Sequence, residues 1–280
     1  MCRTLVIVLT LCAYLGGSPA RAEDPPVKTL DTAQALFYNG RYAEATAMSR
    51  ALNDDDDAQL AVFELRTSAL LFQLRRAIGE PADKEKALKA CVPCPELMKS
   101  FTQEFEAGQQ AAREVLRQHP KDPKALFFLG KLDLNYVWLV LGTLGRRTGW
   151  NEYWEARRSL DAALALRPDY LRAQVARAWI DYIVDTRMPW GTGWLLGGGN
   201  KKKALTVMRA AAAADPSLDF YASAEALFGL WDMQVREKNF KAALDSAHRL
   251  AAIFPDNPEV ARFIAARGPK TQGTVRPDVP

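Results

Sequence analysis

The sequence predicts an all-α fold, a solenoid of antiparallel helix pairs in which two central repeats are enlarged. Nearly every segment of the 280 residues carries apolar residues at helical spacing, and no stretch alternates apolar and polar residues as a half-buried strand would. One pattern of small residues and proline also recurs along the chain. A fixed period of about 20 to 50 residues is typical of repeat architectures.

The recurring pattern is clearest in the segments EARRSLDAALALRPDY, KALTVMRAAAAADPSL and KAALDSAHRLAAIFPDN. In the first, Ala156 is followed at offsets 4, 7 and 12 by Leu160, Ala163 and Pro168. The first three positions share one helix face, their small residues allow a neighbouring helix to approach, and the proline ends the helix. The equivalent sets are Ala204, Met208, Ala211 and Pro216, then Ala243, Ala247, Leu250 and Pro255, and more weakly Gly108, Ala112, Val115 and Pro120.

This pattern resembles the second helix of a tetratricopeptide repeat. In TAQALFYNGRYAEATAMSRAL, the residues Gly40, Tyr42 and Ala45 resemble the turn and the small position of the same motif. Gly130 fits the glycine of the family's first helix, whereas Ala178 and Trp231 replace that glycine elsewhere. The resemblance covers about two thirds of the chain and implies a right-handed superhelix.

The spacing of the prolines predicts the domain organisation. Pro120, Pro168, Pro216 and Pro255 are 48, 48 and 39 residues apart, so two repeats exceed the usual 34 residues by about 14. The extra residues fall between the two helices of each pair. We expect a signal peptide at 1–22, repeats at about 29–57, 58–120, 121–168, 169–216 and 217–255, a capping helix at 256–267 and a disordered tail at 268–280, with the solenoid spanning 23–267.

The first residues are typical of a secretory signal peptide. Arg3 precedes an apolar run from Leu5 to Leu15, and Ala20-Arg21-Ala22 provides a cleavage site with small residues. The run is shorter than the roughly 20 residues needed to span a bilayer. We expect a mature chain starting near Glu23 that is exported to a bacterial periplasm. An uncleaved anchor is the alternative, and no later segment is expected to be long and apolar enough to cross a membrane.

The charge of the mature chain is small. Removal of Arg3 and Arg21 lowers the formal net charge from +4 to +2, because both lost residues are basic. This surplus is too small to predict binding to nucleic acid or to an anionic membrane. We therefore expect no nucleic-acid partner and no stable membrane insertion.

Cys91 and Cys94 in KACVPCPEL are the two cysteines that remain after cleavage. In an oxidising compartment, a C-x-x-C pair can close a small disulfide. A thioredoxin-like motif needs a strand before it and a helix at its start, whereas helical sequence precedes this pair. We expect a structural disulfide in an inter-helix loop, with redox catalysis and free thiols or a metal site as alternatives.

No pattern of catalytic or metal-binding residues stands out. The segment NDDDDAQLAVFE resembles a calcium loop, but Ala58 occupies the position where the sharp turn needs glycine. His119 and His248 stand singly, without an acidic partner and a nucleophile in a known pattern. We therefore expect no enzymatic activity, no metal and no cofactor.

The segment WGTGWLLGGGNKKKAL, residues 190–205, raises the question of a phosphate loop. Asn200 separates the last glycine from the lysines, and no Ser or Thr follows at the required position. Under a 48-residue shift, Gly193 and Gly197 align with Gly145 and Gly149, which favours an architectural role for these glycines. Asn200 is a good N-cap, and an anion site at this helix start is the alternative.

Six of the seven tryptophans lie around the two inserts and predict an aromatic surface that binds a protein or peptide. Core filling by longer helices is the alternative. Asp133 and Asp181 also align under the 48-residue shift and are expected to line a groove, or else to form ion pairs. The full set of candidate binding residues is Asp133, Trp138, Arg146, Arg147, Trp150, Tyr153, Trp154, Trp179, Asp181, Arg187, Trp190, Trp194 and Asn200.

These features predict a non-enzymatic scaffold that mediates protein–protein interaction in the cell envelope, with a protein or peptide partner of unknown identity. A second possibility comes from the long repeats with a Gly-Gly step before the second helix. They resemble the helical-repeat periplasmic component of tripartite (TRAP-type) solute transporters. That resemblance implies a small-molecule ligand in a pocket lined by Trp150, Trp154 and Trp190.

Overall fold

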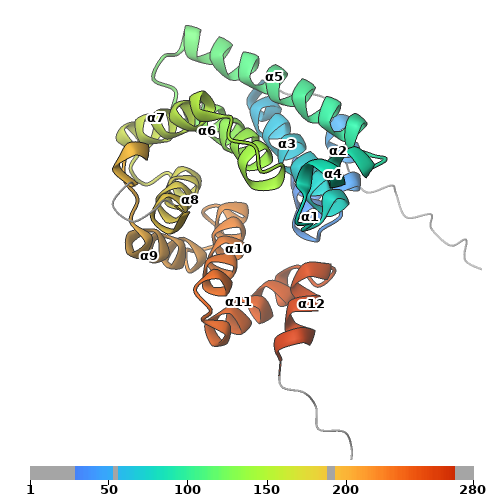
Figure 1. Cartoon of the computed structure of the whole chain (residues 1–280). Coiled ribbons are helices and arrows are strands. Elements are labelled where there is room, and N and C mark those ends of the chain that lie inside the picture. The colour runs from blue at the N-terminus through green and yellow to red at the C-terminus, as the bar shows by residue number, and fades with distance from the viewer. Residues whose placement is uncertain (1–28, 53–55, 188–192, 269–280) are drawn as a thin grey trace, which may run out of the picture.

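The computed structural model describes residues 29–52, 56–187 and 193–268. Within these ranges the protein is helical and contains no strand (Figure 1), which confirms the all-α prediction. The predicted signal peptide (1–22) and residues 269–280 of the predicted tail lie outside the described ranges. The helices are α1 (Leu30–Tyr38), α2 (Tyr42–Arg50), α3 (Asp56–Ile78), α4 (Lys84–Ala90), α5 (Cys94–Gln118), α6 (Pro123–Val137), the π-helix η1 (Trp138–Thr143), α7 (Trp150–Leu166), α8 (Leu171–Arg187), the 3-10 helix η2 (Gly193–Leu196), α9 (Lys201–Ala212), α10 (Phe220–Arg236), α11 (Phe240–Ile253) and α12 (Pro258–Arg267).

Capping residues set many of the helix starts. Each such side chain accepts a hydrogen bond from a backbone N–H in the first turn of the helix that follows, which contributes about 1 kcal/mol. Pro123 and Pro258 occupy the first turns of α6 and α12, where a missing N–H costs no hydrogen bond. The capping residues are Thr29, Asp83, Asp122, Asn200, Asp219, Asn239 and Asn257.

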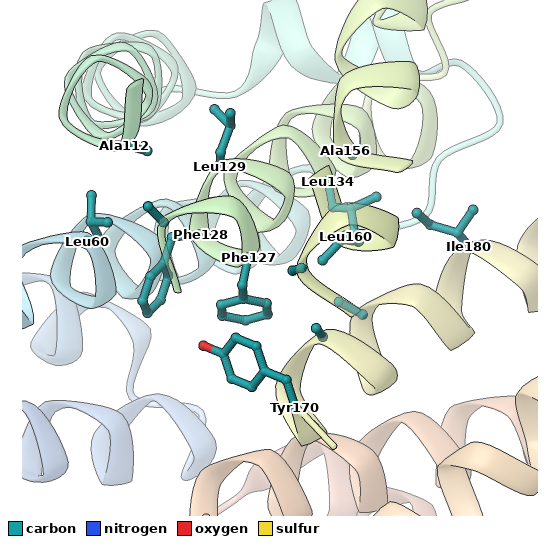
Figure 2. Packing of buried hydrophobic residues seen from close by; sticks show 14 of the residues in the cluster. Leu60, Ala112, Phe127, Phe128, Leu129, Leu134, Ala156, Leu160, Tyr170 and Ile180 are labelled. Carbon is teal, nitrogen blue, oxygen red and sulfur yellow. The ribbon is translucent and has the colours of Figure 1, made fainter. Parts of the chain in front are cut away.

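Residues of the recurring pattern form close helix contacts in the core. Ala156, Leu160 and Ala163 of α7 are all fully buried. A Cβ added to Gly130 of α6 would lie 3.1 Å from the Ala156 carbonyl oxygen and 3.0 Å from Leu160 Cγ, so α6 and α7 approach closely there. Figure 2 shows this core, with the Tyr170 ring packed near α6. The small side chains therefore act as the spacing predicts.

Residues Pro123–Thr143, which comprise α6 and η1, are long and apolar enough to span a membrane by length and composition, with a mean hydropathy of 1.4. The expectation that no later segment is long and apolar enough to cross a membrane is therefore wrong. However, 67% of the most apolar 18-residue stretch of this segment is buried inside the protein, where the segment packs against α3, α5 and α7. A central helix of a folded core has the same composition, and burial accounts for the apolar residues here.

The first helix contacts the last part of the described chain. The Tyr38 ring at the end of α1 lies 5.6 Å from that of Phe228 and 5.3 Å from that of Phe254, centroid to centroid. Asn257 Nδ2 donates a hydrogen bond to the Tyr38 carbonyl (2.8 Å), and Tyr221 Oη donates one to the Asp31 carbonyl (2.6 Å). We call these four interactions the closing contacts. Because of them, α1 and α12 lie on the same side of the molecule (Figure 1).

The structure contains the disulfide that the C-x-x-C spacing predicts. Cys91 is the C-cap of α4, and Cys94 is the buried first residue of α5, so the bond spans an inter-helix turn. A helix does begin at the motif, which the sequence interpretation did not foresee. The element before it is a helix and not the strand of a thioredoxin-like site.

Reduction of this disulfide is expected to release α4. None of the seven residues of α4 is buried; Lys84 Nζ donates to the Gly142 carbonyl (2.6 Å) and Glu85 pairs with Arg146 (3.1 Å). A disulfide that closes so short a loop contributes about 2 kcal/mol. Hydrogen exchange with and without a phosphine reductant should show residues 84–93 exchanging at least about tenfold faster after reduction. Equal exchange in both states would show that packing alone holds α4.

Candidate functional site

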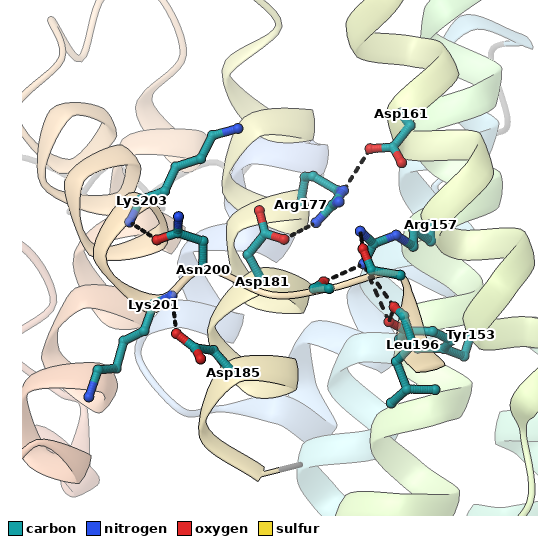
Figure 3. Close-up of polar contacts among 12 residues, drawn as sticks. Tyr153, Arg157, Asp161, Arg177, Asp181, Asp185, Leu196, Asn200, Lys201 and Lys203 are labelled. Carbon is teal, nitrogen blue, oxygen red and sulfur yellow. Dashed lines mark hydrogen bonds and ion pairs between the residues drawn. The ribbon is translucent and has the colours of Figure 1, made fainter. Parts of the chain in front are cut away.

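Two side chains of α7 hold the glycine-rich segment 193–200. Tyr153 Oη donates a hydrogen bond to the Leu196 carbonyl at 2.7 Å. Arg157 Nη1 donates to the carbonyls of Leu196 and Gly198, at 3.1 Å each, and its Nη2 donates to the carbonyl of Gly197. Figure 3 shows the guanidinium between α7 and this segment. The segment is thus fixed to α7 by four hydrogen bonds to its backbone oxygens.

The start of α9 already binds a carboxylate of the protein itself. Asp185 Oδ2 accepts a hydrogen bond from the Lys201 backbone N–H at 2.7 Å, and the Asn200 side chain caps the Lys203 N–H at 2.9 Å (Figure 3). A helix N-terminus attracts anions through such free N–H groups. Asp185 and Asn200 therefore occupy the positions that an external phosphate would need. This arrangement favours the architectural interpretation of the glycine-rich segment.

Three large apolar side chains are exposed next to these anchors. Trp194 is 73% exposed and Leu195 52%, both on η2, and Trp150 at the start of α7 is 43% exposed. The Trp150 ring lies 6.5 Å from the ring of Tyr153, which bonds to Leu196. We call Trp150, Trp194 and Leu195 the aromatic patch. Trp190, which was also predicted to belong to this surface, lies outside the described residues.

The other predicted tryptophans lie deeper in the fold. Trp138 on η1 and Trp179 on α8 pack edge to face, with ring centroids 6.2 Å apart. Trp154 is half-buried against the core and lies 5.3 Å from the Tyr153 ring. The cluster of tryptophans in the sequence thus divides into an exposed part and a part that fills the core.

Comparison with protein families, with curated proteins and with solved structures finds no match in any of the three.

Asp133 does not line an open groove. Its side chain is fully buried on α6, where Gln109 Nε2 donates to Oδ1 and no described group bonds Oδ2. Burial, together with the smaller effect of the nearby Glu155 carboxylate, raises the pKa of Asp133 to about 8. The expectation that this carboxylate lines a groove is therefore wrong, and its described partner is an amide and not a cation. The carboxylate faces α5 and α7 instead.

Replacing Asp133 by asparagine is expected to stabilise the protein at alkaline pH. The folded carboxyl stays protonated up to a pKa of about 8, whereas the unfolded one ionises near 3.8, so wild-type stability falls as the pH rises between these values. The variant has no proton to lose. Urea unfolding should show a gain of about 2–4 kcal/mol at pH 8.5 and little difference at pH 4. A variant no more stable than the wild type at pH 8.5 would contradict the buried, protonated state.

Asp181 forms an ion pair, which is the alternative foreseen for it. Arg177 bridges Asp181 and Asp161, with N–O distances of 2.6 Å to each (Figure 3). Arg146 pairs with Glu85, while Arg147 and Arg187 are exposed. The two aspartates and these arginines therefore do not share one groove.

The sequence interpretation missed a group of ionisable side chains that come mainly from α3, α6, α8 and α10. Lys131 of α6 forms an ion pair with Glu225 of α10, across 94 positions of sequence. Arg172 of α8 binds both oxygens of Asp219, at 2.6 and 3.0 Å. Glu64 of α3 accepts a hydrogen bond from Ser68 Oγ at 2.7 Å. We call these five charged residues, together with Tyr38, the inner charge cluster.

The groups of the inner charge cluster influence one another. Burial alone lowers the pKa of the Lys131 ammonium, but the Glu225 and Glu64 carboxylates outweigh this effect and raise it above its ordinary value. Burial raises the pKa of Glu64, although Lys131 acts in the opposite direction. The Lys131 side chain is 14% exposed and that of Glu225 22%, so water still reaches the pair. In the sequence, the available signal was a lysine directly after the helix-packing Gly130.

Two hollows on the described surface contain none of the predicted residues. One of about 280 Å³ lies between α2, α3 and α5, where Thr46, Gln73 and Leu97 form part of its wall. Within the described ranges, no three His, Cys, Asp or Glu residues lie close enough to hold a metal ion.

Proposed function

We propose that this chain is an exported, non-enzymatic binding protein of the tetratricopeptide-like class. In this proposal the helix pairs form a right-handed superhelical solenoid with two enlarged central repeats, and the aromatic patch binds another protein in the cell envelope. The exposure of Trp194 (73%), together with that of Leu195 and Trp150, is the observation that carries the proposal. Large aromatic side chains dominate the binding energy of protein interfaces, and patches of exposed apolar residues mark such sites.

The way the patch is held supports a binding role. Arg157 and Tyr153 fix the backbone of η2 and of the residues that follow, so Trp194 and Leu195 are carried on an ordered turn. Binding to an ordered surface loses less conformational entropy than binding to a flexible loop. The polar groups around the turn are engaged in these structural bonds, which favours holding a partner over chemical transformation.

The proposal can be tested by capture of the partner. Wild-type protein and the Trp194→Ser and Trp150→Ser variants would be cross-linked in the native envelope, purified and analysed by mass spectrometry. We expect one protein to be enriched with the wild type and lost with both variants. Leu218→Ser is the matched control, because Leu218 is 78% exposed but lies in the loop before α10. Identical captures by all four proteins would refute the role of the patch.

A second candidate function is binding of a small solute, as the resemblance to TRAP-type components implies. The inner charge cluster favours it, because Lys131, Glu225, Arg172 and Asp219 are 14–23% exposed inside the fold. Native mass spectrometry of protein purified from its own host distinguishes the two functions. A bound small molecule that is lost in Glu64→Gln and kept in Trp194→Ser supports the solute, and absence of any bound molecule counts against it.

A further inference from the structure

We infer that the protein segment bound by the aromatic patch is acidic as well as apolar. This inference rests on the proposed function and specifies the chemistry of its partner. It comes from the charged side chains near the patch, whereas the patch itself is defined by its exposed apolar side chains. Arginine and carboxylate groups pair with defined geometry, so a basic rim selects partners as well as attracting them.

Three exposed arginines lie close in the sequence to the patch residues or to side chains that pack beside them. Arg147 lies three residues before Trp150, and Arg158 lies one helical turn after Trp154 on the same face of α7. Arg187 lies one turn after Val184, which is the side chain nearest to a Cβ built on Gly193 at the start of η2. None of the three guanidinium groups has a hydrogen-bond or ion-pair partner among the described residues.

Most carboxylates of the same region are already engaged within the protein. Five of them bind an arginine or a backbone N–H, and none of the five pairs with the three exposed arginines. Glu152, in the first turn of α7, is the exception, because its carboxylate acts on Asp133 as a like charge and raises the pKa of that group. The engaged pairs are Glu85 with Arg146, Glu155 with Arg113, Asp161 and Asp181 with Arg177, and Asp185 with the Lys201 N–H.

Arg157 adds a further positive charge directly beneath the patch. Its guanidinium bonds to three backbone carbonyls and to the Tyr153 hydroxyl, and to no carboxylate in the described part of the chain. Carbonyl oxygens satisfy its hydrogen bonds but do not cancel its charge. The apolar side chains of the patch therefore lie in a positive field, although the whole chain carries a formal net charge of only +4.

These charges define a partner with one or two large apolar side chains flanked by Asp or Glu. The apolar side chains would contact Trp194, Leu195 and Trp150, while the carboxylates would reach Arg147, Arg158 and Arg187. Such a rim mainly affects association rate and specificity, and its contribution weakens with salt. A neutral apolar partner would gain nothing from the three arginines.

Synthetic peptides test the inference on the intact protein. The probes are fluorescein-labelled 12-residue peptides: one with Leu and Phe among aspartates, one with lysines replacing the aspartates, and one with serines replacing Leu and Phe. Fluorescence anisotropy should show the acidic apolar peptide binding at least about tenfold more tightly than either relative. Raising the salt from about 0.05 to 0.5 M should weaken that binding.

Charge reversal provides the decisive comparison. The variant Arg147→Glu/Arg158→Glu/Arg187→Glu should prefer the lysine peptide to the aspartate peptide. A control that reverses the same number of charges elsewhere should keep the wild-type preference; it carries Lys121→Glu, Lys241→Glu and Arg262→Glu at exposed positions. An unchanged preference in the first variant, or a reversed one in the control, overturns the inference.

Two further outcomes separate this inference from its basis. If partner capture depends on Trp194 but not on the three arginines, the proposed function stands and the acidic partner is wrong. Vesicles containing about one third phosphatidylglycerol provide the other comparison, because lipid phosphates could meet the same arginines. Binding of these vesicles, with arginine dependence and without peptide binding, would identify a lipid surface and overturn the inference.

Discussion

Replacing Gly199 by alanine is expected to detach the glycine-rich segment 193–200 from α8. A Cβ at this position would lie 2.6 Å from both the Asp181 carbonyl oxygen and the Asp185 nitrogen. These are backbone atoms of α8, which cannot rotate aside as a side chain can. The segment must therefore move, and the bonds of Tyr153 and Arg157 to it should break. We expect a loss of about 2–3 kcal/mol in unfolding free energy and at least about tenfold weaker partner binding.

Gly198→Ala is the matched control for this substitution. Gly198 has a left-handed backbone (φ 76°) but no atom within 4 Å of an added Cβ. Strain in this region costs about 1–2 kcal/mol and leaves the contacts of the segment intact. Hydrogen exchange of residues 193–205 should therefore accelerate in Gly199→Ala far more than in Gly198→Ala. Equal acceleration in both variants would show that the close approach to α8 does not hold the segment.

Replacing Lys131 by methionine is expected to be the most disruptive single change in the inner charge cluster. It leaves the Glu225 carboxylate without its ion-pair partner and removes the cation nearest to Glu64. Breaking a buried pair costs about 3–5 kcal/mol, and the partial exposure of both side chains reduces this to about 2–3 kcal/mol. Urea unfolding at neutral pH measures the loss.

The double variant Lys131→Met/Glu225→Leu distinguishes the effect of an unpaired Glu225 carboxylate from the effect of losing the lysine side chain. It removes both charges and replaces them with apolar groups of similar size, so much of the stability should return. Arg113→Met is a control at the exposed pair with Glu155, where a loss below about 1 kcal/mol is expected. If the double variant is as unstable as the single one, the uncompensated Glu225 carboxylate is not the cause.

Local sequence patterns predicted the parts of the fold that depend on neighbouring residues. The offsets of 4 and 7 between Ala156, Leu160 and Ala163 require only a regular helix, and all three residues are buried. The capping role of Asn200 and the Cys91–Cys94 bond likewise span a few residues. Such features follow from one helix or one turn, so the sequence alone is sufficient to predict them.

Contacts between distant segments could not be predicted in this way. The alignment of Asp133 with Asp181 selected the wrong face of α6. Asp133 and Lys131 are two positions apart on this helix, so their side chains point in nearly opposite directions. Lys131 is the residue that reaches across the fold, and its partner Glu225 lies on α10, 94 positions later in the chain. The proximity of Tyr38 to Phe254 depends on how all the helices between them pack, which no local pattern encodes.

The closing contacts change how the described helices are expected to unfold. In an open stack of repeats, a terminal unit can fray while its distant neighbours stay folded, because each unit touches only the next one. Here, loss of the packing around Phe254 would also uncover Tyr38, more than two hundred residues earlier in the chain. Fraying at one end thus weakens the other, and the described helices are expected to melt as a single cooperative unit.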